Sequence, residues 1–231
     1  MDKNELLASS DIFGGISGQA RQHVANRLSK RCCQAGEVVY RRGEPARTFY
    51  GICDGLVRFS AASPGSKDVV LGVFGPGQWF GEIGVFDGGP RAVDATAAET
   101  ATLYALEQRD LLELCHEEPG LLLRFVERFS RSVRVAEDSI IDSSFLRPEA
   151  RLAKRLLAFC DNDGCIEATE RGPSIRVALD EVVSMAGITP ENAGRQLKSW
   201  ERDGLVSCDY GRVVLVDIPR LRLVVSNTAR E

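Results

Sequence analysis

Between Cys32 and Leu106, short runs rich in β-branched and aromatic residues alternate with breaks that contain glycine or proline. The runs are EVVY, TFYGIC, LVRFSAAS, DVVLGVF, AVDATAA and ATLYAL, and the breaks include RRGEP, SPGSKD and FGPGQ. Runs of this length and composition are typical of strands, and glycine and proline favour the turns between them. Regular strands at this spacing predict an all-β barrel or sandwich.

The breaks stop near Glu107, and a helical pattern follows. Six apolar residues recur there in steps of four and three, which is the repeat of a coiled-coil seam. They are Leu122, Val126, Phe129, Val133, Ala136 and Ile140. Further apolar residues lie outside this seam, so we expect the helix to face both its own β domain and a partner helix. A homodimer is the favoured prediction; the alternative is a single amphipathic helix lying on its own β domain.

Pro148 interrupts the helical pattern, because the residue before a proline is excluded from helical geometry. We expect a second compact unit after this break. We expect it to hold a helix, a polar loop (DNDGCIEATERGP), a strand (SIRVAL), two short helices and a hairpin (LVSCDYGRVVLV). The two short helices have the pattern of a helix-turn-helix. Gly187 supplies the turn, Thr189 caps the second helix, and Pro190 takes its first position, where a missing N–H costs nothing.

The second of these helices presents one apolar and one polar face. Ala193, Leu197 and Trp200 form the predicted packed face, and the hairpin that follows is a candidate wing. Arg195 can reach guanine acceptors and Glu191 can accept from cytosine, whereas more distant cations suit phosphates. The predicted DNA-binding residues are Thr189, Glu191, Asn192, Arg195, Lys198, Arg202 and Arg212. A tri-helical unit without DNA function is the alternative.

Composition narrows the classes of protein that the chain can be. No apolar run approaches the roughly 18 residues that a membrane-spanning helix needs, and the N-terminus lacks the layout of a signal peptide. The seven cysteines are scattered and there are two histidines, so neither a zinc site nor a disulfide framework is expected. The net charge of −4 does not favour nucleic acid, so any DNA binding must come from where the charges lie. We expect a cytoplasmic protein without a metal.

The stretch FGEIGVFDGGPRAVDATA places Glu82 and Arg91 close to four glycines in an apolar region. Backbone N–H groups at glycines together with one guanidinium bind a phosphate ester well, and a carboxylate binds sugar hydroxyls. Gly81 and Glu82 at one end, with Arg91 and Ala92 at the other, provide that set. The alternative is an internal Glu82–Arg91 ion pair across a turn.

With these motifs the chain resembles the cyclic-AMP receptor protein family of bacterial transcription regulators along essentially its whole length. FGEIGVFDGGPRA resembles the family's phosphate-binding cassette, and GITPENAGRQLK resembles its recognition helix. The resemblance implies that Glu82 binds the ribose 2′-hydroxyl, that Arg91 pairs with the cyclic phosphate, and that Glu191 and Arg195 contact bases. It implies a ligand site made of Gly81, Glu82, Ile83, Arg91, Ala92, Ala136 and Glu137.

The chain departs from the family pattern in two places. Pro190 stands where the cyclic-AMP receptor has a third base-reading arginine, so the operator should resemble that protein's site without copying it. Ala136 and Glu137 replace the threonine and serine that contact adenine from both subunits. Because the carboxylate of Glu137 could accept hydrogen bonds from guanine, cyclic GMP competes with cyclic AMP as the expected effector, although Ala92 lacks the hydroxyl that cyclic-GMP sites often have.

The expected fold class is α+β: a β-roll (jelly-roll-like) sensor domain over residues 1–116, a dimerisation helix over 117–142, a hinge over 143–148 and a winged helix-turn-helix domain over 149–231. The expected function is a homodimeric regulator, an activator that binds palindromic double-stranded DNA and RNA polymerase in response to cyclic AMP. The sequence shows neither a metal-binding cluster nor a nucleophile placed with a base, so we do not expect an enzyme. A vestigial pocket, with control by abundance or thiol redox state, is the other hypothesis.

Overall fold

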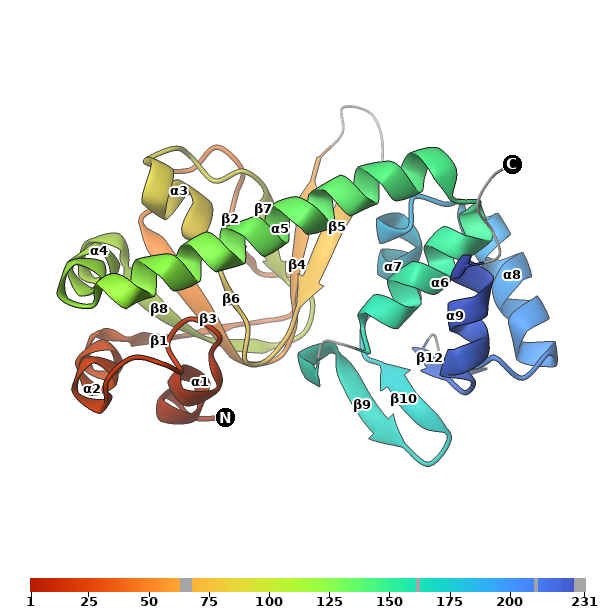
Figure 1. Cartoon of the computed structure of the whole chain (residues 1–231), viewed down its shortest axis with the longest axis horizontal. Helices are drawn as coiled ribbons and strands as arrows, with labels where there is room; N and C mark the ends of the chain where they lie inside the picture. The colour runs from red at the N-terminus through yellow and green to blue at the C-terminus, as the bar shows by residue number, and fades with distance from the viewer. Residues whose placement is uncertain (63–67, 161–162, 210–211, 227–231) are drawn as a thin grey trace. The chain divides into compact units, whose positions relative to one another are not determined.

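The computed structural model describes residues 1–62, 68–160, 163–209 and 212–226 (Figure 1). The chain divides into two compact units. The N-terminal unit comprises Met1–Asp68 and Gly72–Val133, and the C-terminal unit comprises Val69–Leu71 and Arg134–Glu231. Among the described residues, none of the helices is both long enough and apolar enough to span a bilayer.

Two four-stranded sheets form the β region, and they confirm the predicted β-rich fold. One sheet has the order β1-β8-β3-β6, with β1 (Ser29–Cys33), β8 (Ala101–Glu107), β3 (Thr48–Asp54) and β6 (Trp79–Phe80). The other has the order β2-β7-β4-β5, with β2 (Val38–Tyr40), β7 (Asp94–Ala97), β4 (Val57–Ala61) and β5 (Val69–Phe74). Buried side chains from both sheets, among them Tyr40, Ile52 and Phe80, share one hydrophobic cluster.

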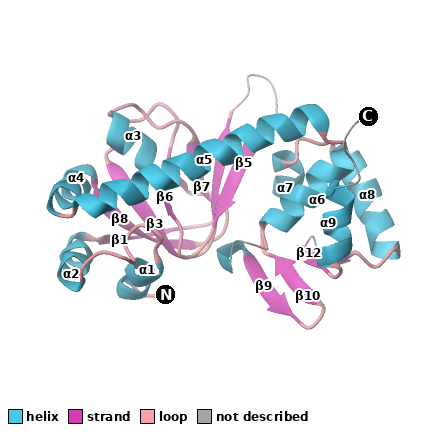
Figure 2. Ribbon diagram, viewed as in Figure 1, coloured by secondary structure: helices cyan, strands magenta, loops and turns pink. Residues whose placement is uncertain are grey.

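Helices cover the first of these sheets (Figure 2). They are α1 (Lys3–Ser9), α2 (Gly18–Arg27) and α4 (Gln108–Glu117). Their apolar side chains join Phe49, Trp79 and Leu106 in a second buried cluster. Ser17 is the N-cap of α2, and its side chain accepts a hydrogen bond from the N–H of Ala20.

The glycine-rich stretch contains a short helix, α3 (Glu82–Asp87), where the sequence pattern indicated a β region. Glycines in the left-handed conformation stand on both sides of it, Gly81 with φ of 92° and Gly88 with φ of 71°. Residues with a Cβ rarely adopt such φ values, so both ends of this six-residue helix favour glycine. Glu82 therefore occupies the first position of a helix.

The long helix α5 (Pro119–Phe145) extends three residues beyond its predicted end at 142 and into the predicted hinge. The hydroxyls of Ser143 and Ser144 donate to the carbonyl oxygen of Ile140, so both serines are satisfied inside the helix. The break falls at Arg147, whose backbone is extended ahead of Pro148. Only Leu146 and Arg147 separate α5 from α6 (Pro148–Ala158).

In its described part, the C-terminal unit contains a four-stranded sheet of order β11-β12-β10-β9 and, after α5, helices α6 to α9. Its elements are β9 (Ile166–Thr169), β10 (Gly172–Ile175), β11 (Val206–Asp209), β12 (Arg212–Leu215), α6, α7 (Leu179–Met185), α8 (Pro190–Arg202) and α9 (Ile218–Ser226). Figure 2 shows β9 and β10 as a hairpin that extends away from these helices. Residues 210–211, between the two predicted wing strands, lie outside the described residues.

Two predictions for this unit were wrong. The segment expected as a polar loop contains β9 and the start of β10, and the strand expected over 174–179 ends at Ile175. β9 is an edge strand whose side chains are mostly exposed, so its polar sequence lacks the alternation that marks a half-buried strand. Helix α9, which packs against α6 through the buried Leu221, was not predicted at all.

Candidate functional site

Glu82 and Arg91 come from the two ends of the cassette, which we define as residues 80–92, and both are buried. Their exposed fractions are 9% and 5%. Charged side chains are rarely buried to this degree unless each has a partner that offsets the loss of hydration. The partners of these two residues therefore define what the site can bind.

The partners of Arg91 among the described residues are neutral groups. Its Nη1 donates to the carbonyl oxygen of Gly81 at 2.8 Å, and its Nη2 donates to that of Thr48 at 2.7 Å. Its guanidinium carbon lies 4.1 Å from the centroid of the Tyr40 ring, in cation–π geometry. The Nε atom is buried and has no hydrogen-bond partner, and among the described residues no carboxylate oxygen lies within 4.0 Å of the guanidinium. Arg91 is thus a buried cation that lacks an anion.

Tyr40 remains a neutral phenol beside this cation. Burial raises its pKa far above the ordinary value of tyrosine, while the nearby positive charge of Arg91 opposes that shift. The neutral ring offers its negative face to the guanidinium without forming an ion pair. Tyr40 therefore helps to place Arg91 without neutralising its charge.

Glu82 pairs with an arginine of α5. Its Oε1 accepts from the Nε of Arg128 at 3.0 Å, and the two side chains are 11% and 17% exposed. The internal Glu82–Arg91 ion pair considered as an alternative is therefore not the arrangement among the described residues. Sequence reasoning missed Arg128, although it continues the buried stripe of Leu121 and Phe125 by one step of three. A cation on a core-facing stripe requires a buried carboxylate.

The other predicted ligand residues are accessible. Ile83 is 54% exposed, and Ala92 is exposed beside Arg91. Ala136 and Glu137 are exposed residues of α5 that belong to the C-terminal unit. The structure brings Gly81, Glu82 and Arg91 together, while contact of Ala136 and Glu137 with a base stays a prediction.

A pocket of about 340 Å³ lies on one side of the cassette and is lined in part by cassette residues. Its lining is Gly43, Pro45, Ala46, Arg47, Gly84, Gly88, Gly89, Pro90 and Gln108. Glu82 and Arg91 do not line it, so it differs from the predicted phosphate site. Among the described lining residues Arg47 is the cation, which makes it a useful comparison for Arg91.

The helix-turn-helix has the predicted geometry. Gly187 adopts a left-handed φ of 61° in the turn between α7 and α8. Thr189 is the N-cap of α8, and its hydroxyl oxygen accepts from the N–H of Asn192 at 3.3 Å. The predicted packed face is confirmed, since Ala193, Leu197 and Trp200 are 2%, 3% and 4% exposed.

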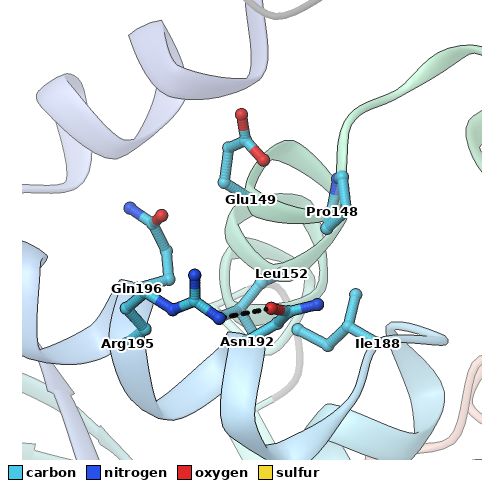
Figure 3. A pocket seen from close by; sticks show the side chains of 7 residues that line it. All are labelled: Pro148, Glu149, Leu152, Ile188, Asn192, Arg195 and Gln196. Carbon is cyan, nitrogen blue, oxygen red and sulfur yellow. Dashed lines mark hydrogen bonds between the residues drawn. The ribbon is translucent and has the colours of Figure 1, made fainter.

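The opposite face of α8 is polar and open to solvent. Glu191, Asn192, Arg195, Lys198 and Arg202 are all exposed. The Nη2 of Arg195 donates to the Oδ1 of Asn192 at 3.0 Å, which orients the guanidinium along the helix (Figure 3). These two residues also line a pocket of about 220 Å³ between α6 and α8.

The wing pairs β11 with β12 in antiparallel register, from Val206 opposite Leu215 to Asp209 opposite Arg212. The exposed Arg212 forms a 3.1 Å ion pair with Glu167 of β9. Its predicted phosphate contact would therefore compete with an acidic neighbour. An exposed pair of this kind is weak, on the order of 1 kcal/mol or less, so the competition is small.

Comparison with known proteins matches both units. Residues 30–118 match the cyclic nucleotide-binding domain family, and residues 150–224 match the Crp-like helix-turn-helix domain family. The chain is 26% identical over 222 residues to a CRP-like cAMP-activated global transcriptional regulator of Mycobacterium tuberculosis, covering 94% of this chain and 97% of that protein. It is 25% identical to the cyclic AMP receptor protein of Thermus thermophilus, covering 90% and 93% of the two chains.

The fold is similar to that of solved regulators. The c-di-GMP responsive global regulator CLP of Xanthomonas campestris superimposes with a TM-score of 0.71 at 24% identity, over 86% of this chain and 99% of that one. At this identity the likeness shows the fold alone.

A β-roll with a cyclic-nucleotide cassette, joined by a long helix to a helix-turn-helix, defines a cyclic-nucleotide-responsive, DNA-binding transcription regulator. The chain belongs to the cyclic-AMP receptor protein family, which consists of transcription regulators and not of enzymes.

Proposed function

We propose that the chain acts as a homodimer that binds cyclic AMP at Arg91 and Glu82 and then binds a palindromic operator. The observation that supports the ligand site best is the state of Arg91: a buried guanidinium with an unpaired Nε and only neutral partners. A cyclic phosphate would supply the missing negative charge and an acceptor for that atom.

Cyclic AMP is the first expected effector because it is named for the Mycobacterium tuberculosis relative and for the Thermus thermophilus relative. The residues proposed to contact the base leave cyclic GMP as an alternative, since the exposed carboxylate at Glu137 can accept hydrogen bonds but cannot donate them. Guanine offers N1–H and N2–H donors to such a group, whereas adenine offers only its exocyclic amine.

Thiol redox control is a weaker alternative. Burial raises the pKa of the Cys115 thiol to about 11, and it also raises the pKa of the Cys33 and Cys208 thiols. The thiolate is the reactive form, so a raised pKa makes these cysteines less reactive at neutral pH. Cys32 is exposed and is the cysteine best placed to react.

Features of α5 and α8 support the proposed dimer and its DNA complex. Four of the six seam residues are large and exposed in the single chain: Leu122, Val126, Val133 and Ile140. Pairing this seam would bury them and bring two copies of α8 together. Ligand binding would favour the arrangement in which the two α8 helices lie about 34 Å apart, as successive major grooves require. Contact with RNA polymerase would make the bound dimer an activator.

Calorimetric titration with cyclic AMP and cyclic GMP tests the ligand site. We expect the wild-type chain to bind, and Arg91→Leu to lose about 2 to 5 kcal/mol of binding free energy, because the buried phosphate would lack its charge partner. Arg91→Lys keeps the charge but not the planar fork, so its loss should be intermediate.

Arg47→Leu is the matched control, since it removes a cation from the pocket beside the cassette. It should leave the affinity unchanged. A loss confined to Arg47→Leu would place the nucleotide in that other pocket, and equal binding by wild type and Arg91→Leu would contradict the proposed site. Operator binding that is identical with and without nucleotide would favour a vestigial pocket.

A further inference from the structure

Asp11, in the loop between α1 and α2, lies against a row of arginines on α5. Its Oδ2 is 3.0 Å from the Nη2 of Arg131 and 3.7 Å from the Nη1 of Arg128. Its backbone carbonyl oxygen accepts from the Nη1 of Arg124 at 3.2 Å. Because the three arginines follow one another in steps of four and three, they occupy one side of the helix.

Arg128 is the arginine at which this row meets the cassette. Its Nε donates to Glu82, its Nη1 faces Asp11, and its Nη2 donates to the carbonyl oxygen of Trp79. Each nitrogen of this guanidinium thus faces an oxygen from a different part of the chain: α3, β6 and the loop between α1 and α2. The guanidinium is planar and rigid, so fixing its outer nitrogens also fixes the direction of the Nε–H that points at Glu82.

We propose that Asp11 is a positioning residue for the nucleotide, which acts by holding Arg128 and through it the carboxylate of Glu82. This inference rests on the proposed function, in which Glu82 accepts a hydrogen bond from the ribose 2′-hydroxyl. With Oε1 of Glu82 held by Arg128, its other oxygen is left to accept from the sugar. Asp11 itself does not contact the sugar in this proposal.

The exposure of Asp11 separates this role from a structural one. The side chain of Asp11 is 48% exposed, and that of its partner Arg131 is 59% exposed. Exposed ion pairs contribute little to folding stability. Removing the Asp11 charge should therefore leave the fold intact while it loosens Arg128, and the effect should be visible in ligand affinity.

The test is calorimetric titration of the full chain with cyclic AMP and with 2′-deoxy cyclic AMP, which lacks only the hydroxyl that Glu82 would bind. For Asp11→Asn we expect the affinity for cyclic AMP to fall about fivefold and the affinity for the 2′-deoxy nucleotide to stay unchanged, as for a coupled pair of groups. Asp11→Glu, which keeps the carboxylate, should recover most of the loss.

Glu113→Gln is the matched control. Glu113 is also 48% exposed and also pairs with an arginine, Arg27, but it lies on α4 and takes no part in the network described above. It should change neither affinity. Thermal unfolding of all the variants checks that each is folded.

Three outcomes are informative. A selective loss for cyclic AMP in Asp11→Asn, recovered in Asp11→Glu, supports the proposal. If wild type prefers cyclic AMP over the 2′-deoxy nucleotide and Asp11→Asn keeps the same preference, the role of Asp11 is overturned and the ligand site stands. If wild type binds neither nucleotide, the proposed function fails, and the role of Asp11 fails with it.

Discussion

At the scale of the residue, Arg91 and Arg128 have partners of opposite kinds: Arg91 is buried, and the side chain of Arg128 is 17% exposed. Arg128 has a carboxylate on each of two nitrogens, whereas Arg91 has carbonyl oxygens and an aromatic face. The charge of an ion-paired arginine such as Arg128 is balanced by its carboxylate partners. A buried cation with only neutral partners, such as Arg91, still attracts an anion. We therefore expect Arg91 to bind the ligand, whereas the partners of Arg128 lie within the protein.

Gly84 shows how tightly the cassette is packed. A Cβ on this residue would lie 2.4 Å from the Cβ of Ala46 and 2.6 Å from the carbonyl oxygen of Gly89. Gly84→Ala should therefore destabilise the N-terminal unit by about 1 to 3 kcal/mol, measured by urea unfolding. Gly120→Ala, where a Cβ meets nothing within 4 Å, should change the stability by less than about 0.5 kcal/mol. Similar stabilities for the two variants would show that the cassette can relax.

At the scale of the element, the proposal gives base recognition and phosphate contact to different residues of α8. Arg195→Ala should relax specificity at one base pair by about 1 to 3 kcal/mol, because a bidentate contact to guanine is lost. Lys198→Ala should weaken binding evenly and reduce the salt dependence by about one phosphate contact. Fluorescence anisotropy with operators mutated base by base, at several salt concentrations, distinguishes the two. Equal losses on every sequence from both variants would contradict these roles.

The elements also show which features a sequence can predict. The β runs and the two helices of the helix-turn-helix were predicted because each carries a repeated apolar pattern with turn or cap residues at its ends. Helix α3 was missed because six residues between left-handed glycines are too few to display a helical period. The Glu82–Arg128 pair was missed because its residues are 46 positions apart and only the packing of α5 brings them together. Local sequence located the cassette, but it did not predict the ion pair of Glu82 with Arg128.

At the scale of the whole molecule, the predicted dimer would form when the seam on one side of α5 pairs with the same seam of a second copy. Val133 lies in the seam and Val135 does not; at 100° per residue they point to opposite sides of the helix. Both are similarly exposed in the single chain, at 56% and 60%. Val133→Asp should raise the dimer dissociation constant by about 100-fold, since the symmetric interface would bury two unpaired carboxylates.

Val135→Asp is the matched control and should remain dimeric in sedimentation experiments. If both variants dissociate, the interface is wider than the seam. If neither does, the helix pairs through another surface or not at all.

The chain has two tryptophans, and each unit contains one of them. Trp79 is fully buried in β6, stacked on Phe49, and its carbonyl oxygen is held by Arg128 beside Glu82. Trp200 lies in the packed face of α8. The Trp79→Phe variant keeps only Trp200, so its intrinsic fluorescence would report on the DNA-binding unit. The Trp200→Phe variant keeps only Trp79, so its fluorescence would report on the cassette. The delay between the two fluorescence changes after nucleotide is added would measure the rate at which a conformational change in the cassette reaches the DNA-binding unit.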